Sequence, residues 1–167
     1  HPRLRLVVVG PQDPDKPDGL HPTAIAEAEE LGVVFTGLRR DMPECYAAMD
    51  IFVTATHREG FPRAAMEASA SGLPLVATDI RGCRQVVDNG VTGLLVPVKN
   101  PVALAAAIAE LATGPVLRSR MGAAAVAKAH REFDQQRVIE LTLATYDRLW
   151  AERAPRRRRS LAGRGTP

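Results

Sequence analysis

Five short runs of β-branched and other apolar residues recur along the first hundred positions, and segments with helical periodicity separate them. The first run, "LRLVVVG", is continuously apolar at its centre, which is typical of a strand covered on both faces of a sheet. Strands joined by helical crossovers pair in parallel. The sequence therefore predicts an α/β fold with a doubly wound parallel sheet. The predicted strands are residues 4–10, 33–37, 51–56, 73–79 and 92–98.

Beyond residue 100 the pattern changes to three successive helices, each opening on a Pro or Asp start signal. They are residues 101–114, 115–133 and 134–153. We expect them to form a helical C-terminal cap on a single domain of residues 1–152. Residues 153–167 are basic, have no apolar periodicity, and are expected to be disordered. Such a tail is either simply solvated or attracted to an anionic membrane surface.

Charge and cysteine usage exclude several function classes. The chain has a net charge of +3, yet residues 1–152 carry 16 basic and 19 acidic side chains, a net charge of −3. A nucleic-acid-binding body needs a basic stripe, so no nucleic-acid partner is expected. No apolar run approaches the roughly 20 residues of a membrane span. Cys45 and Cys83 lack metal or disulfide spacing, which favours a reducing, cytoplasmic setting. The chain opens at His1 without a leader pattern and is interpreted as a fragment of a longer protein.

The stretch "REGFPRAAMEASASG" at residues 58–72 carries the candidate chemistry. Pro62 suits the first position of a helix, which places Glu59 just before the helix and Glu67 inside it. Gly60 allows a tight turn, so the free amides of the first helical turn point outward at the carboxyl end of the preceding strand. In open parallel sheets ligands bind at that edge. The helix dipole there stabilises an anion such as a diphosphate.

The local chemistry allows two interpretations of the Glu59 and Glu67 carboxylates. Glu59 and Glu67 are acceptors, so they offer hydrogen bonds to hydroxyl groups, and Glu67 suits a vicinal diol such as ribose. A diphosphate between two hydroxyl-rich rings is a nucleotide sugar. Alternatively, the acids only favour the dipole of an ordinary capped helix, with Glu67 facing water.

These residues, taken with "SGLPLVATDIRG" and "VVDNGVTGLLVPVKNP" downstream and "VVFTGLRRDMPECYAAMDIFVTATHREG" upstream, resemble a known family. Glu59 and Glu67 are similar to the Glu-x7-Glu motif of retaining, bacterial-type glycosyltransferases with the GT-B fold, over roughly residues 4–148. The resemblance implies a Rossmann-like, donor-nucleotide-binding C-terminal half-domain. It further implies an enzyme, needing no metal or other cofactor, that transfers a hexose or N-acetylhexosamine from a nucleotide sugar, with UDP favoured, to a glycan or lipid-linked acceptor.

The resemblance also implies roles for single residues. Glu67 would bind the ribose hydroxyls, and Glu59, the catalytic residue of the set, would bind the hydroxyls of the transferred sugar. Gly60 and Phe61 would present main-chain amides to the sugar and diphosphate, and Pro62 and Arg63 would belong to the same donor-binding stretch. Gly37, Leu38 and Arg39 would meet the nucleobase, and Gly10 would lie beneath the diphosphate. No protein nucleophile is required.

Some features depart from the family pattern. Gln85 stands where many relatives have an acid. The N-terminal acceptor domain and a first strand carrying an Arg and a Lys for the diphosphate are missing. Since stabilising the leaving diphosphate is a major part of such catalysis, we expect the chain alone to bind nucleotide weakly and to transfer no sugar. The alternatives are a sugar-nucleotide epimerase of the same architecture and a non-catalytic binding module.

Two further groups are assigned no chemistry. Asp13-Pro14-Asp15 matches the Asp-x-Asp form of metal-dependent glycosyltransferases, but it lies in a Pro-rich loop without a third ligand, so no metal is expected. Cys83 has no His base near it in the sequence, and inert packing is the better interpretation.

Overall fold

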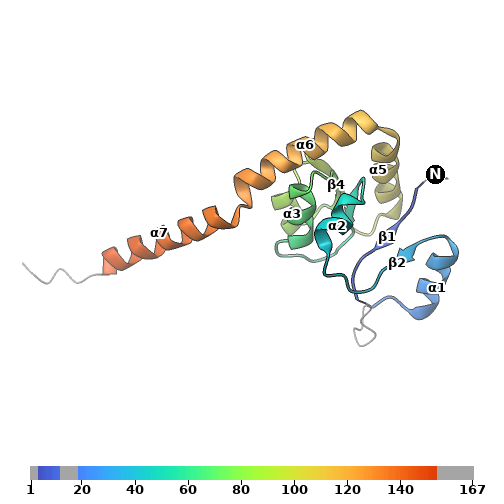
Figure 1. Cartoon of the computed structure of the whole chain (residues 1–167), viewed down its shortest axis with the longest axis horizontal. Coiled ribbons are helices and arrows are strands. Elements are labelled where there is room, and N and C mark those ends of the chain that lie inside the picture. Colours follow the sequence, from blue (N-terminus) through green and yellow to red (C-terminus); the bar gives the residue numbers. More distant parts are fainter. Residues whose placement is uncertain (1–3, 12–18, 154–167) are drawn as a thin grey trace, which may run out of the picture. The chain divides into compact units, whose positions relative to one another are not determined.

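The computed structural model describes residues 4–11 and 19–153 (Figure 1). The chain divides into two compact units, residues 1–129 and residues 130–167. The strands are β1 (Val7–Val8), β2 (Val34–Phe35), β3 (Phe52–Thr54), β4 (Leu75–Thr78) and β5 (Gly93–Val96). The helices are α1 (Pro22–Glu30), α2 (Met42–Ala47), α3 (Arg63–Ala70), α4 (Arg81–Val86), α5 (Pro101–Thr113), α6 (Pro115–Glu132) and α7 (Gln135–Arg153).

Every strand pair among the described residues is parallel, as the sequence predicts. β1 pairs with β2, and β3, β4 and β5 form a separate sheet in that order. The helical crossovers α3 and α4 connect the strands of this second sheet. The Rossmann-like α/β class is therefore confirmed, although the strands form two sheets, of two and three strands, instead of one.

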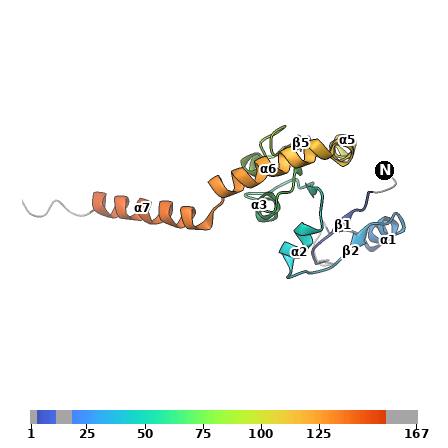
Figure 2. The ribbon, with the colours of Figure 1, turned by 45° about the horizontal axis from the view of Figure 1, so that its top comes forward.

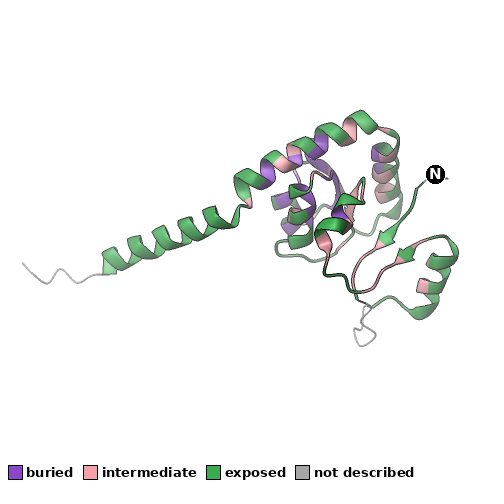
Figure 3. Ribbon diagram, viewed as in Figure 1, coloured by how far each residue is buried: buried purple, intermediate pink, exposed green. Residues whose placement is uncertain are grey.

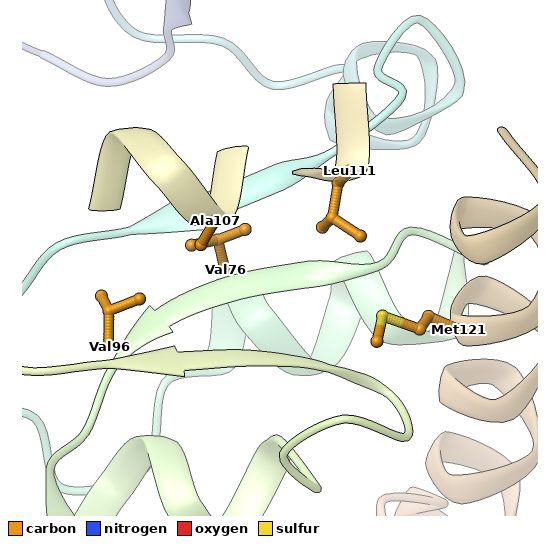
Figure 4. Close-up of a cluster of buried hydrophobic side chains, with 5 residues drawn as sticks. All are labelled: Val76, Val96, Ala107, Leu111 and Met121. Carbon is orange, nitrogen blue, oxygen red and sulfur yellow. The ribbon is translucent and has the colours of Figure 1, made fainter. Parts of the chain in front are cut away.

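The three-stranded sheet buries both of its faces, because alternate residues of a strand point to opposite sides. Val76 of β4 packs with Ala107 and Leu111 of α5 and Met121 of α6 on one side (Figure 4). On the other side, Phe52 of β3 packs against a cluster that draws on α2 and α3. The members of that second cluster are Tyr46, Ala68, Leu73, Met42 and Met49. In the view of Figure 2, α6 is drawn across the region of β5, with α5 at its end and α3 below it. The sheet is thus wound on both faces.

The first strand differs from the sequence prediction. The run at residues 4–10 was expected to be a strand buried on both faces, yet Leu6 and Val7 are 45% and 42% exposed. β1 is two residues long and pairs only with β2. None of the described residues up to Asp41 reaches full burial (Figure 3). The physical reason is that β1 has a single neighbouring strand, and none of the described residues forms a packed layer over it.

The cap prediction is confirmed for α5 and α6, whose buried residues pack on β4 and β5. α7 contributes no buried residue. The division into two compact units falls between residues 129 and 130, inside α6. The tail at 154–167 lies outside the described residues, so its boundary and its contact with a membrane stay predictions. No single helix of the described residues is long and apolar enough to cross a membrane. Residues 101–113 and 115–153 taken together have the length and composition for it, but they are bent sharply at the break between them.

Candidate functional site

The carboxyl ends of β3, β4 and β5 meet at one edge of the sheet, because the strands are parallel. Two hydrogen bonds tie this edge together. The Thr78 hydroxyl donates to the Thr56 carbonyl oxygen at 2.5 Å. The Asp79 amide donates to the Val96 carbonyl oxygen at 2.7 Å. Since Thr78 is only 4% exposed, its hydroxyl is a fixed anchor for the loop that leads from β3 to α3.

The turn at Glu59 and Gly60 rests on the backbone of α4. A Cβ atom added at Gly82 would lie 2.8 Å from the Glu59 carbonyl carbon and 2.9 Å from the Gly60 carbonyl oxygen, and closer still to the Glu59 carbonyl oxygen. Real Cβ atoms do not approach backbone that closely, so only glycine allows this contact. Gly82 therefore determines where the turn sits. The sequence analysis missed it, because its close neighbour is remote in the sequence.

The start of α3 lies one residue later than expected. Pro62 was predicted at the first helical position, but it is the N-cap residue, with an extended ψ of 99°, and Arg63 is the first helical residue. Its φ of −73° fits proline. The Pro62 carbonyl accepts the first helical hydrogen bonds, from Ala65 and Met66 at 3.1 and 3.2 Å. The amides of Arg63 and Ala64 consequently have no acceptor within the helix.

Glu67 is held by a buried tyrosine. The Tyr46 hydroxyl donates a hydrogen bond to Oε2 of Glu67 at 2.9 Å. Tyr46 is 3% exposed, and its ring meets Phe52 edge to face, with the ring centroids 6.2 Å apart. Burial, and then the Glu67 carboxylate, raise the pKa of the Tyr46 hydroxyl well above its ordinary 10.0. The phenol therefore stays protonated and remains a donor at any physiological pH.

The remaining residues of the motif leave an open surface. Glu59, Gly60 and Arg63 are exposed, and Phe61 is 42% exposed. A Cβ atom at Gly60 would meet nothing within 4 Å. The rim in front of α3 is thus not filled by packed side chains, and a ligand can reach the turn.

The second group of candidate residues lies where β1 and β2 end. The Gly10 amide donates to the Gly37 carbonyl oxygen at 3.0 Å, so these two glycines are neighbours. Their φ angles of 149° and 67° favour glycine. Leu38 is 67% exposed. Arg39 Nε donates to Asp41 Oδ1 at 2.8 Å, and this pairing holds the pKa of the Asp41 carboxyl below its ordinary value.

The contacts of the described residues thus assemble two groups. One contains Glu59, Gly60 and Pro62 with Glu67, and it is supported by Tyr46 and Gly82. The other contains Gly10 and Gly37 with the segment up to Arg39. The ligand role given to each of these residues stays a prediction.

The other candidates form no additional site. Cys83 is fully buried, and burial raises the pKa of its thiol, which agrees with inert packing. Gln85 is exposed on α4. Asp13 and Asp15 lie outside the described residues. Within residues 4–11 and 19–153, no three His, Cys, Asp or Glu side chains come together in a way that could hold a metal ion.

The chain is similar in sequence to proteins of one known family. Residues 1–114 match the family model described as "Glycosyl transferases group 1". The chain is 38% identical over 151 residues to the D-inositol 3-phosphate glycosyltransferase of Kribbella flavida, covering 86% of this chain and 35% of that protein. It is 40% identical over 97 residues to the GDP-mannose-dependent alpha-mannosyltransferase of Mycobacterium tuberculosis, covering 57% of this chain and 24% of that protein.

Solved structures show the same fold. Sucrose-phosphate synthase from Thermosynechococcus elongatus superposes with a TM-score of 0.79 and 27% identity, covering 88% of this chain and 39% of that one. HepE of Anabaena, in complex with UDP and glucose, superposes with a TM-score of 0.78 and 25% identity, covering 88% and 41%. The chain spans about a third of the length of the first curated relatives that it matches.

Proposed function

Because the chain belongs to the group 1 glycosyltransferase family, we propose that it is the donor-binding half of an enzyme that transfers a sugar from a nucleotide sugar. One observation carries the proposal. The turn at Gly60 is open and free of side-chain packing, it lies directly before α3, and exposed Glu59 and tyrosine-anchored Glu67 flank it. This arrangement offers main-chain donors to a diphosphate and carboxylate acceptors to hydroxyl groups on either side.

The mechanism assigned to these residues is positioning and charge stabilisation. The amides of the first turn of α3 and its dipole hold the diphosphate, and so stabilise the negative charge that grows on it as the glycosidic bond breaks. Glu67 orients the donor through the ribose. Glu59 orients the transferred sugar, so that the acceptor attacks the face from which the diphosphate departs, with retention of the anomeric configuration. Neither carboxylate has to become a nucleophile.

The donor is proposed to be a UDP-sugar carrying a hexose or N-acetylhexosamine. HepE is a solved neighbour in complex with UDP and glucose, which supports UDP. A relative is named as GDP-mannose-dependent, so a GDP-sugar is the alternative donor. The acceptor is proposed to be a glycan or a lipid-linked saccharide. The relatives cited are glycosyltransferases, so the epimerase and the non-catalytic module are less well supported.

Ligand-observed NMR of the 167-residue chain tests the donor site. Binding of UDP-, GDP- and ADP-sugars is measured for the wild-type chain and for Glu67→Gln. Glu110→Gln, at an exposed glutamate of α5, serves as the matched control. We expect saturation transfer to the ribose protons of at least one donor, lost in Glu67→Gln and kept in Glu110→Gln. Ribose contacts that survive Glu67→Gln unchanged would show that the role given to Glu67 is wrong.

The isolated chain is expected to bind the nucleotide weakly and to release no transferred product. Its acceptor-binding partner is proposed to be the N-terminal domain of a longer protein, since the curated relatives are about three times as long. Detection of sugar transfer by the 167-residue chain alone would contradict this expectation.

A further inference from the structure

Tyr46 has no part in the motif that carries the proposed donor site, yet it touches a residue of that motif directly. Its hydroxyl donates to Glu67 Oε2 at 2.9 Å from a ring buried between α2, α3 and β3. We propose that Tyr46 is a positioning residue that sets the preference of the site for nucleotides with a ribose diol. This inference rests on the proposed function, because it assumes that Glu67 binds ribose.

The first step is that the contact fixes a side chain that would otherwise move. Glu67 is exposed on α3, and a free glutamate side chain samples many rotamers. Tyr46 is 3% exposed and packs among Ala68, Leu73 and Phe52, so its hydroxyl occupies one place. The hydrogen bond to the fixed Tyr46 hydroxyl therefore restricts the rotamers of Glu67 before a ligand binds, so binding loses less conformational entropy.

The second step is that the contact leaves capacity for a diol. A carboxylate accepts about four hydrogen bonds. Tyr46 occupies one acceptor position on Oε2, so Oε1 and the second position on Oε2 remain for two neighbouring hydroxyls. A pinned carboxylate presents these positions in one orientation, which favours a rigid vicinal diol over a single hydroxyl or none.

The third step is that the Tyr46 hydroxyl stays protonated at physiological pH. The raised pKa of the Tyr46 hydroxyl keeps it protonated, so it can donate to Glu67 throughout the physiological pH range. The chain has only two tyrosines. The other, Tyr146, lies on α7, is 65% exposed and provides a matched control.

The test measures the affinity ratio between UDP and 2′,3′-dideoxy-UDP, and the same ratio for GDP, by NMR titration of the 167-residue chain. Tyr46→Phe removes only the hydroxyl and keeps the packed ring. We expect it to weaken binding of the ribose nucleotide by about three- to tenfold, the usual effect of one hydrogen bond, and to leave the dideoxy nucleotide unchanged. Tyr146→Phe is expected to change neither.

A double-mutant cycle separates the positioning role of Tyr46 from the ribose-binding role of Glu67. If Tyr46 acts through Glu67, adding Tyr46→Phe to Glu67→Gln causes no further loss. If Glu67→Gln lowers the ratio and Tyr46→Phe does not, the positioning role is wrong and the donor site stands. If Glu67→Gln leaves the ratio unchanged, or neither nucleotide binds, both proposals fall. Equal weakening of ribose and dideoxy nucleotides by Tyr46→Phe, with a lowered melting temperature, indicates a purely structural role and overturns the inference.

Discussion

Replacing Gly82 by alanine should damage the donor site without touching any residue that is proposed to bind the ligand. The added methyl group would lie 2.8 Å from the Glu59 carbonyl carbon and 2.9 Å from the Gly60 carbonyl oxygen. Those atoms are main chain, so no side-chain rotation relieves the contact. The Glu59 carbonyl oxygen would lie closest, so either α4 or the Glu59–Gly60 turn must move by more than about 1 Å to restore ordinary contact distances of about 3.5–4 Å.

Two opposing energies decide the size of the effect. Alanine has a better helix propensity than glycine by at most about 1 kcal/mol, and less than that at the second position of a helix. Overpacking of a tightly packed site costs typically 1–3 kcal/mol. The clash therefore wins, and we expect Gly82→Ala to lower the free energy of unfolding by about 1–2 kcal/mol. At about 4 °C per kcal/mol, the melting temperature falls by roughly 4–8 °C.

The binding consequence is expected to exceed the stability consequence. The first turn of α3 is proposed to present amides to the diphosphate, and a displacement near 1 Å at such a site can cost on the order of 100-fold in function. We expect UDP affinity of the folded variant to fall at least about tenfold. The assay is NMR titration well below the melting temperature, so that unfolding does not enter the affinity.

Gly122→Ala is the matched control. A Cβ atom at Gly122 would collide with the backbone of Gly72 just as severely, but at the far end of α3. α3 is about 12 Å long, at 1.5 Å per residue over its eight residues, so this collision lies at the opposite end of the helix from the first turn. The control should lose similar stability and keep its affinity. Normal affinity in folded Gly82→Ala, or equal loss in both variants, would refute the reasoning.

Two further predictions concern groups outside the donor site. Cys83 is fully buried and its thiol pKa is raised above its ordinary 9.0, whereas Cys45 is half-buried. Iodoacetamide at pH 8 should therefore label only Cys45, as measured by peptide mass spectrometry. Rapid labelling of both thiols without denaturant would contradict this. Lys128 places a 7% exposed ammonium 2.5 Å from the half-exposed Asp88 carboxylate. Asp88→Ala removes this carboxylate from a buried ammonium and should lower the free energy of unfolding by about 1–3 kcal/mol, as measured by urea unfolding. Lys128→Met removes the charge itself and should lower it by less; the reverse order would show that the pair contributes little.

The sequence predicted the fold class because strand and helix periodicities depend on neighbours along the chain. Parallel pairing followed from the helical crossovers between the predicted strands. The rule that a continuously apolar strand is covered on both faces describes β4, which lies in the predicted strand 73–79 and is fully buried. The same rule failed for the run at residues 4–10, since burial of a strand depends on what covers it and not on its own composition. Pro62 was misplaced by one residue, because proline's fixed φ suits both the N-cap and the first helical position.

The site was predicted only where its residues are neighbours in sequence. Glu59, Gly60 and Glu67 stand in one motif, so their chemistry was visible. Tyr46 is 21 positions from Glu67, and its contact exists only because α2 and α3 pack on the same face of the sheet. Gly82 is likewise distant from Glu59, and its importance comes from the backbone approach between α4 and the turn. Neither signal has a periodicity or spacing that a single sequence can reveal.

The two acids of the motif are fixed by different means, and this difference determines which substitutions each one tolerates. Glu67 is fixed through its side chain by a phenol in the core, so its orientation responds to changes around Tyr46 and Phe52. Glu59 is fixed through its main chain by the packing of Gly82, so its position responds to the backbone of α4. Its own side chain stays exposed. If the proposed roles hold, core substitutions near α2 should act on ribose recognition, whereas substitutions in α4 should act on binding of the diphosphate and the transferred sugar.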